Sequence, residues 1–372
     1  MKQEFFGKIK DTILKAYNRS HVFHIKQRVK KDYKNFIKLY GEIKRRDPGN
    51  YIKYWNRLSR SVDPTAYQIY HTLHGVEDIQ IVPIECYYTL IEPCLNDYTM
   101  SKSYKDKNNF ERLFNREVFP TTYMRNMDGI YYDRDYQTLS DQQVRDILKA
   151  LPRDSEKVML KPSLATGMRT NVRVVDFNRE ILTLEYLNEN YRHDFLIQQY
   201  IVQNEYFDQL GTMNNIRLDT YRSVSDNSIF IYDARSGFNS ETGSDRSQYS
   251  NDQVAINESG ELGSFSLNSL GKISSTIPNS TIPFSNMKPI PIFDELKKVA
   301  TDIAFLCPYH RRLGMDMIVD KKGKVYIYEV NFSFLGVNKS QYLGGGLFKE
   351  HTEEVIEYCN RNKSKIRFLP FT

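Results

Sequence analysis

Three polar residues interrupt the apolar stretch "GMDMIVDKKGKVYIYEVN" (314–331): Asp316, Glu329 and Asn331. The stretch predicts two short strands joined by a turn at "KKGK". If Asp320 pairs with Val325, strand alternation places Asp316 opposite Glu329 and puts all three polar side chains on one face. Two carboxylates about 5 Å apart repel each other unless a cation lies between them.

The chemistry of these three side chains indicates the cation. Carboxylate and amide oxygens are hard ligands, which favour Mg²⁺ or Mn²⁺ over zinc. Mg²⁺ takes few protein ligands and completes its shell with phosphate oxygens, so a nucleoside triphosphate is the expected third party. The alternative is a set of exposed hairpin residues, but a shared face favours the metal site.

Cationic residues precede this hairpin in the chain. Lys161 ends the apolar strand "EKVMLKP" and is followed by Ser163 and a loop that contains Gly167. A lysine at this position is suited to phosphate oxygens, although it could also be a solvated strand end. The pattern GxxxxGK[ST] is absent, so this loop is not a P-loop.

Two arginines are expected on neighbouring strands. Arg217 lies in "NNIRLDTYR" and Arg235 in "IYDARSGF". The planar guanidinium fork suits phosphate or carboxylate, and two such groups can steady a phosphoryl group during transfer.

The pattern of elements predicts a mixed class, either α/β or α+β. Residues 1–46 predict helix, first around Phe5 to Leu14 and again over about 29–44. Strand and helix patterns then alternate without a fixed repeat. Residues 239–286 are rich in Ser, Asn, Gly and Thr, which predicts a long loop system that could contain one hairpin.

Composition limits the possible classes of protein. The chain has 372 residues, of which 40% are hydrophobic, enough for two or three subdomains. It contains no apolar run of the ~18 residues that a membrane span requires. We expect no signal peptide at the N-terminus, and we expect the four cysteines, which lack CxxC spacing, to be free thiols in a reducing cytosol.

Charge is concentrated near the N-terminus. Residues 1–60 hold 17 Lys and Arg against 5 Asp and Glu, whereas the whole chain holds 52 against 46. This region is expected to contact an anionic membrane surface, an acidic partner or a glycan-assembly complex, or to be a solvated helical face. No nucleic-acid-binding motif is present, so nucleic acid is not an expected partner.

Taken in chain order, the motifs carry a resemblance to a known family. "YKDKNNFERLF", "LKPS", "IQQYI", "NNIRLDTYR", "DARSG" and the polar hairpin resemble the ATP-grasp superfamily. The resemblance is strongest to the sugar-transfer-associated ATP-grasp proteins of bacterial polysaccharide synthesis. It implies an α+β ATP-grasp fold, in which two α+β subdomains clasp a nucleotide, preceded by a mainly helical N-terminal region.

The resemblance also implies domain bounds and residue roles. The expected segments are a basic helical region at 1–100, a small subdomain at 101–195 and a large subdomain at 196–372. The expected phosphate contacts are Lys107, Lys161, Ser163 and Gly167. The expected adenine-binding hinge is Gln198, Gln199, Tyr200 and Ile201. Arg217 and Arg235 would steady the transferring phosphoryl group, and Asp316, Glu329 and Asn331 would hold Mg²⁺ or Mn²⁺.

The reaction that the resemblance implies is ATP-dependent ligation of a carboxylate to an amine. ATP phosphorylates the carboxylate, and the amine then displaces phosphate from the acyl-phosphate to form an amide. The expected substrates are small or sugar-linked, such as a capsule or O-antigen sugar or its amino-acid substituent. The expected location is the cytoplasm or the inner face of the membrane. The alternatives are a kinase of a sugar or amino acid on the same fold, and a non-catalytic nucleotide-binding scaffold.

Two features depart from the family pattern. The loop after Lys161 has one glycine, Gly167, where a richer glycine segment is usual, and the stretch after Arg235 lacks the usual Asp-Asn and double glycine. Asn251-Asp252 is a candidate remnant of that second pattern. The glycine run at 344–346 would line an acceptor pocket or form a turn.

Overall fold

The structure is a computed structural model that describes residues 2–154, 156–164, 172–210, 212–239, 251–268, 271–366 and 368, with the side chains of 2–11, 152–154, 212–214, 239 and 251 left aside. The chain divides into two compact units, and each is discontinuous in sequence. The first unit comprises Met1–Ser101, Glu205–Asp316 and Asn331–Thr372. The second unit comprises Lys102–Asn204 and Met317–Val330. The domain bounds expected from the sequence stay a prediction.

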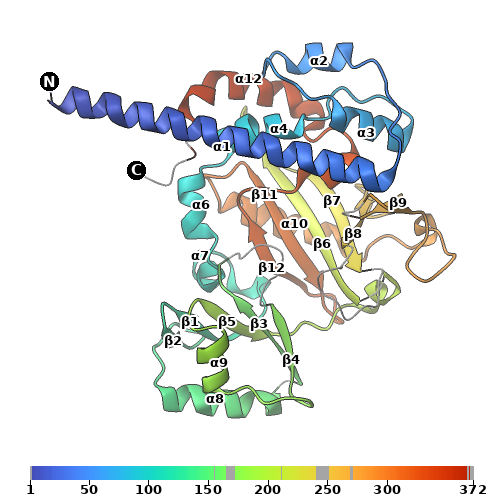
Figure 1. The fold of residues 1–372 in the computed structure, drawn as a ribbon. Coiled ribbons are helices and arrows are strands. Elements are labelled where there is room, and N and C mark those ends of the chain that lie inside the picture. The colour runs from blue at the N-terminus through green and yellow to red at the C-terminus, as the bar shows by residue number, and fades with distance from the viewer. Residues whose placement is uncertain are drawn as a thin grey trace. The chain divides into compact units, whose positions relative to one another are not determined.

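A seven-stranded sheet in the order β10-β9-β8-β7-β6-β11-β12 carries the predicted arginines (Figure 1). Its strands are β6 (Thr212–Arg222), β7 (Ile229–Asn239), β8 (Asn251–Ile256), β9 (Leu262–Leu267), β10 (Ile273–Ser274), β11 (Arg312–Val319) and β12 (Val325–Asn331). The pairing of β6 with β7 is antiparallel and sets Arg217 directly opposite Arg235. The pairings β7–β8 and β8–β9 are also antiparallel, which confirms the α+β class.

Helices of the first unit pack on this sheet and on one another. α10 (Phe293–Phe305) packs on β6 and β7, whereas α11 (Val337–Gly344) packs on β7, β8, β9 and α3. The remaining helices are α1 (Lys2–Tyr40), α2 (Gly49–Trp55), α3 (Thr65–His74), α4 (Ile84–Cys86), the π-helix η1 (Tyr87–Ile91), α5 (Glu92–Leu95), α6 (Tyr98–Tyr104), α12 (Thr352–Asn362) and the short 3₁₀ helices η4 (Glu205–Leu210), η6 (Phe284–Asn286), η7 (Lys349–His351) and η8 (Lys363–Lys365). α6 ends in the second unit, because the boundary follows Ser101.

α1 confirms the expected helical N-terminal region, but it is one continuous helix where two stretches were expected. No glycine or proline occurs between residues 8 and 40, so nothing in the sequence breaks the helix. Its buried residues, Ile25, Val29, Tyr33 and Phe36, recur at steps of four and three and form one apolar stripe. This stripe belongs to a core cluster that also contains Trp55.

The expected loop system at 239–286 contains the hairpin that the sequence allowed, since β8 and β9 pair antiparallel, and β10 adds a third strand that was not expected. The strands are short, and their apolar residues are diluted by Ser, Asn and Gly, which obscured the strand pattern. Val254, Ile256, Leu262 and Leu267 are nevertheless buried. Burial against neighbouring elements therefore decided the structure of this segment.

The second unit contains a five-stranded sheet in the order β2-β1-β5-β3-β4. Its strands are β1 (Thr122–Met127), β2 (Ile130–Tyr132), β3 (Lys157–Pro162), β4 (Arg173–Asp176) and β5 (Phe195–Gln199). Its helices are η2 (Lys107–Asn109), α7 (Phe110–Leu113), η3 (Arg116–Val118), α8 (Asp141–Asp154) and α9 (Leu184–Asn190). Val144 and Leu148 of α8 join Leu187 of α9 and Phe195 of β5 in one apolar cluster.

Two turns near the polar hairpin are defined by glycine. Between β11 and β12, Asp320 N donates to Lys324 O over 2.9 Å and Gly323 has a φ of +83°. The turn therefore closes at Lys324, one residue before the expected partner Val325. At the end of α11, Gly345 has a φ of +87° and Gly346 N donates to Asp78 Oδ2 over 2.7 Å. The run at 344–346 thus includes a helix-ending turn.

Candidate functional site

The carboxylate of Asp316 in β11 is surrounded by donors from the first unit. Asn215 Nδ2 donates to Asp316 Oδ1 over 3.0 Å. Arg217 Nη1 and Asn331 Nδ2 each donate to Asp316 Oδ2 over 3.1 Å. The structure therefore brings the predicted ligands Asp316 and Asn331 together, next to the predicted arginine Arg217.

Asp219 is the centre of a buried charge network around Arg217. Arg217 Nε donates to Asp219 Oδ1 over 2.6 Å, and Arg235 Nη2 donates to Asp219 Oδ2 over 3.3 Å. Arg312 Nη2 lies 3.5 Å from Asp219 Oδ2. Burial raises the pKa of Asp219, but the three arginines outweigh that effect and hold the pKa below its ordinary value.

The guanidinium of Arg235 contacts several side chains of the first unit. Besides Asp219, it contacts Asp233 Oδ2 through Nε at 2.5 Å and Gln253 Oε1 through Nη1 at 2.8 Å. Only 3% of the residue is exposed. Arg235 thus holds Asp219, whereas Arg217 extends from Asp219 to the predicted metal ligand Asp316.

A glycine makes room for Arg217. A Cβ at Gly314 of β11 would lie 1.8 Å from Arg217 Nη2 and 2.6 Å from Asp219 Oδ1. The guanidinium therefore crosses the backbone of β11 at a position where any side chain would displace it. The glycine that precedes "MDM" is explained by this close approach.

In the second unit, two lysines converge on β12. Lys161 Nζ, at the end of β3, donates to Tyr328 O over 3.1 Å. Lys107 Nζ, in η2, forms an ion pair with Glu329 Oε1 at 3.2 Å. Burial, together with the nearby Lys107 ammonium, lowers the pKa of Lys161 to about 7, while Glu329 opposes this shift. The buried ammonium of Lys161 and the partly buried ammonium of Lys107, beside one carboxylate, form a cationic site for further anionic groups.

The backbone links Lys107 to the strand end after Lys161. Lys107 N donates to Ser163 O over 2.9 Å, and Ser163 N donates to Asp194 O over 2.7 Å. Ser163 Oγ is buried and has no hydrogen-bond partner in the described part of the chain. The predicted loop residue Gly167 lies outside the described residues.

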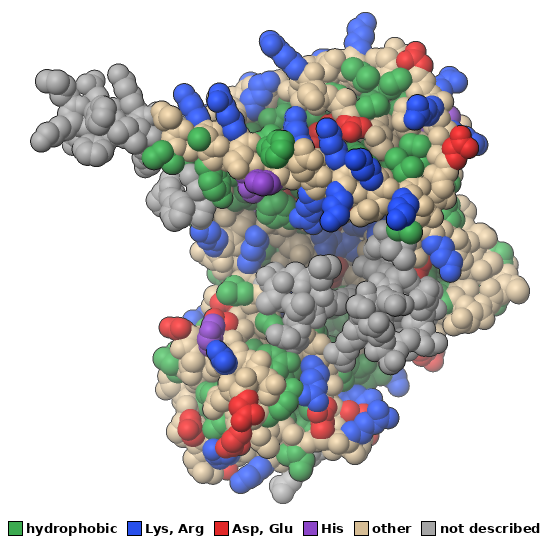
Figure 2. All heavy atoms as spheres, viewed as in Figure 1, with side chains coloured by type: hydrophobic (Ala, Val, Ile, Leu, Met, Phe, Trp, Pro, Cys, Tyr) green, Lys and Arg blue, Asp and Glu red, His purple; other side chains and the backbone are tan. Residues whose placement is uncertain are grey.

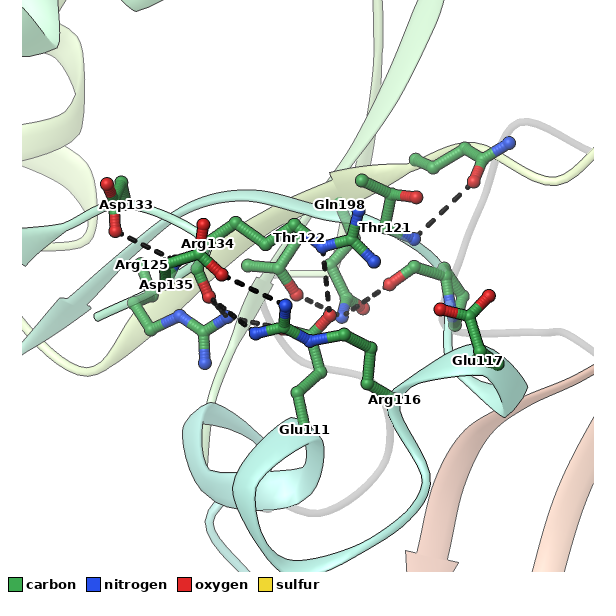
Figure 3. Close-up of polar contacts among 12 residues, drawn as sticks. Glu111, Arg116, Glu117, Thr121, Thr122, Arg125, Asp133, Arg134, Asp135 and Gln198 are labelled. Carbon is green, nitrogen blue, oxygen red and sulfur yellow. Dashed lines mark hydrogen bonds and ion pairs between the residues drawn. The ribbon is translucent and has the colours of Figure 1, made fainter. Parts of the chain in front are cut away.

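The predicted adenine hinge occupies the end of β5 and the residues after it. Gln198 is buried, and its Nε2 donates to Thr122 Oγ1 over 2.9 Å (Figure 3). Gln199 pairs with Val158 of β3, and Gln199 N donates to Thr121 O over 2.8 Å. The Gln198 side chain thus braces β5 against β1. Tyr200 and Ile201 follow β5 and are half-buried.

Buried charges also brace β1 within the second unit. Arg125 of β1 forms an ion pair with Glu111 of α7, and Arg134 Nε lies 3.8 Å from the other oxygen of Glu111 (Figure 3). Arg125 and Glu111 are almost completely buried. Removing one charge of such a pair leaves the other unpaired in the interior, so the pair fixes how α7 packs on the sheet.

The oxygen atoms of Asp316 and Asn331 suit a divalent cation that prefers oxygen ligands. The Asp316 carboxylate is already held by three donors, and a half-turn of the Asn331 amide would present Oδ1 in place of Nδ2. Among the described residues, no group of three His, Cys, Asp or Glu side chains that could hold a metal is found. Asp316 and Asn331 would therefore need phosphate and water oxygens to complete a Mg²⁺ shell.

Asp219 and Arg312 are functional candidates that the sequence did not reveal. Asp219 follows Arg217 by two residues on the same strand, and that spacing is the one signal that indicated a shared face. Arg312 is fully buried, with its guanidinium carbon 5.3 Å from the ring centroid of Phe348. A charged residue next to an apolar strand does not by itself indicate burial.

Residues 89–355 match the family described as sugar-transfer associated ATP-grasp. A search of curated proteins found no match. A similar solved structure is the biotin carboxylase domain of Hydrogenobacter thermophilus 2-oxoglutarate carboxylase with MgADP, ADP and bicarbonate (16% identity, 72% of this chain, 48% of that chain, TM-score 0.42).

Two further solved structures resemble this chain at comparably low sequence identity and TM-score. They are N5-carboxyaminoimidazole synthetase from Staphylococcus aureus (10% identity, 71% of this chain, 56% of that chain, TM-score 0.39) and the ATP-grasp ligase PsnB with a precursor variant, Mg and ADP (14%, 71%, 61%, 0.41). This chain thus spans about half to three fifths of these proteins. Since the family match covers well over half of the present sequence, the chain belongs to the sugar-transfer associated ATP-grasp family and has the α+β ATP-grasp fold.

Proposed function

We propose that the protein is an ATP-dependent ligase that joins a carboxylate to an amine through an acyl-phosphate. Family membership supports ATP as the phosphoryl donor. The observation that carries the proposal is the contact of Arg217 with Asp316, next to Asn331. A cationic fork beside oxygen ligands is the arrangement that stabilises a phosphoryl group in transfer.

The substrate carboxylate attacks the γ-phosphorus of ATP, the bond from γ-phosphorus to the β,γ-bridging oxygen breaks, and ADP leaves. The amine nitrogen then attacks the acyl carbon, and phosphate leaves with the electron pair of the C–O bond. The amine gives up one proton to solvent or phosphate. No protein nucleophile is needed, because positioning and charge neutralisation supply the catalysis.

Residues of this chain have distinct tasks in the proposal. Lys107 and Lys161 bind phosphate oxygens, and Arg217 steadies the transferring group. Asp316, Glu329 and Asn331 would hold Mg²⁺, which would neutralise phosphate charge. Asp219 keeps Arg217 in place from the buried side.

We further propose that the acceptor or donor is a sugar, or the amino-acid substituent of a sugar, in bacterial surface polysaccharide synthesis such as that of capsule. The support is the family's association with sugar transfer. The carboxylate and the amine are therefore sought among sugar-linked compounds first.

The first experiment is a thermal shift assay with ATP, ADP and GTP, each with and without Mg²⁺. We expect an Mg²⁺-dependent rise with adenine nucleotides that is lost in Asp316→Asn. Asp320→Asn is the matched control, since Asp320 is on the same hairpin and its Oδ1 accepts from Lys322 N and Lys324 N, which an amide oxygen can also do.

Phosphate release with pairs of acids and amines then tests the reaction. Release of ADP and phosphate that requires both partners supports the ligase. A stable phosphorylated product formed without an amine would instead establish a kinase. Nucleotide binding without turnover in any mixture would establish a scaffold.

A further inference from the structure

Glu92 of α5 is a buried carboxylate whose two oxygens each accept two hydrogen bonds. Oε1 accepts from Leu335 N over 3.0 Å and from Tyr87 Oη over 3.2 Å. Oε2 accepts from Phe334 N over 2.9 Å and from Tyr98 Oη over 2.7 Å. Glu92 therefore ties the backbone of Phe334 and Leu335 to the start of α5.

The segment that Glu92 holds begins three residues after the predicted metal ligand Asn331. Phe334 has a φ of +55°, a left-handed conformation that costs free energy for a residue with a side chain. Its half-exposed ring stacks on Tyr98 at a centroid distance of 5.8 Å and on Tyr88 at 6.3 Å. The hydrogen bonds to Glu92 and these ring contacts together maintain the unfavourable backbone.

Asn96 lies four residues after Glu92, and its side chain binds the backbones of Arg312 and Phe332. Its Nδ2 donates to Arg312 O over 2.7 Å and to Phe332 O over 2.9 Å, and its Oδ1 accepts from Arg312 N over 2.9 Å. Phe332 is the neighbour of Asn331, and Arg312 begins the strand that carries Asp316. The Asn96 side chain thus fixes the spacing between the backbones that carry both ligands.

We propose that Glu92 and Asn96 are positioning residues for the magnesium site, acting through the backbone on Asn331 and Asp316. This inference rests on the proposed function. Residues that orient metal ligands commonly change metal affinity by about 10–100-fold when they are substituted, because ligand atoms must be held within about 0.5 Å. The π-helix η1, which ends immediately before Glu92, is of a kind often found beside functional sites.

The test measures the affinity of the full chain for Mn²⁺ in the presence of saturating ADP. Electron paramagnetic resonance gives the concentration of free Mn²⁺ at each point of the titration. Glu92→Gln places an amide NH₂ against two donors, so we expect Mn²⁺ binding about 10–100-fold weaker. Tyr98→Phe removes one donor and keeps the ring, so we expect a smaller loss, about threefold. Asn96→Ala should also weaken Mn²⁺ binding by about tenfold or more.

Glu354→Gln is the matched control. Glu354 of α12 accepts from Tyr221 Oη over 2.7 Å and from Ser223 Oγ over 3.2 Å, so it is a hydrogen-bonded carboxylate like Glu92, but both of these donors lie outside the segment 332–335. We expect this variant to bind Mn²⁺ as the wild type does, even if its melting temperature falls.

The outcomes separate the two proposals. If the wild type with ADP binds no Mn²⁺, the proposed function fails and the positioning role fails with it. If the wild type binds Mn²⁺ and folded Tyr98→Phe and Asn96→Ala bind it equally well, the positioning role alone is overturned. If Glu92→Gln does not fold, those two variants decide the result.

Discussion

Lys161 is held in a place where an ammonium group is poorly solvated. Its Nζ has a backbone carbonyl as a partner, and burial with Lys107 lowers its pKa to about 7. A phosphate oxygen would supply the charge that this environment lacks. Side chains of this kind gain more from binding an anion than solvated lysines do.

Replacing Lys161 with methionine should therefore weaken nucleotide binding. We expect the affinity for ADP, measured by isothermal titration calorimetry, to fall about 10–100-fold, the usual effect of losing one charged hydrogen bond. Lys157→Met is the control, because Lys157 is on the same strand with a more exposed side chain that pairs with Asp176 at 3.4 Å. Equal affinity in the two variants would remove Lys161 from the phosphate site.

Glu85 gives the first unit a dependence on pH. Burial raises the pKa of Glu85 from 4.5 to about 7, although the backbone N–H of Asp63 stabilises the carboxylate. The folded chain therefore keeps a proton that the unfolded chain loses. The stability that this provides is complete below pH 4.5 and is lost as the pH rises to about 7.

Replacing Glu85 with glutamine should remove that loss, because an amide oxygen can still accept from Asp63 N. Between pH 5 and pH 8, we expect the free energy of unfolding of Glu85→Gln to rise by roughly 2–3 kcal/mol relative to that of the wild type. Urea unfolding at both pH values measures the difference, with exposed Glu42→Gln as control. Parallel pH dependence in all three proteins would show that Glu85 ionises alike in the folded and unfolded chain.

At the scale of elements, β11 and β6 are packed so closely that Gly314 leaves no room for a side chain beside Arg217. We expect Gly314→Ala to displace the guanidinium from Asp316 and to reduce ATP-dependent phosphate release about 100-fold. Gly263→Ala in β9 is the control, since its Cβ would meet Ala255 at an ordinary 3.5 Å. Near-normal turnover in Gly314→Ala would mean that the Arg217–Asp316 contact is dispensable.

The sequence predicted the elements that have a strong local pattern. The strand positions of Arg217, Arg235, Asp316 and Asn331 follow from local apolar patterns, whereas the register that sets Arg217 opposite Arg235 and the turn that closes at Lys324 do not. β8 to β10 were anticipated only as one possible hairpin, because their apolar residues are sparse among Ser, Asn and Gly and give a weak strand pattern, although each pairs with its neighbour in sequence. Asp219 and Arg312 were missed as a buried pair, because only the tertiary fold brings three arginines to one carboxylate.

At the scale of the whole molecule, Lys and Arg side chains gather over α1 (Figure 2). Lys31, Lys34 and Lys38 are exposed, opposite the stripe that buries Val29 and Tyr33. None of the helices in the described ranges is long and apolar enough to cross a bilayer. We therefore expect any membrane contact of α1 to be electrostatic and peripheral.

Replacing Lys31, Lys34 and Lys38 with glutamate should weaken binding to vesicles that contain phosphatidylserine. At about 1 kcal/mol for each lysine near the surface, the loss should be at least ~100-fold in flotation or sedimentation assays at low salt. The control changes exposed Lys272, Lys288 and Lys298 to glutamate, which alters net charge equally. If both triple variants lose binding to the same extent, the contact depends on net charge and not on α1.

The chain passes between the two units four times, and this affects its synthesis. The second unit receives its last segment, Met317–Val330, long after β1 has left the ribosome, and the first unit is completed only by the residues that follow. At about 5–20 residues per second, Lys107 and Lys161 are synthesised roughly 10–40 s before their partners Glu329 and Tyr328. A nascent chain that stops before residue 330 therefore lacks residues of the first unit's core, such as Val337, Leu343 and Val355, and exposes apolar side chains that these residues cover in the folded protein.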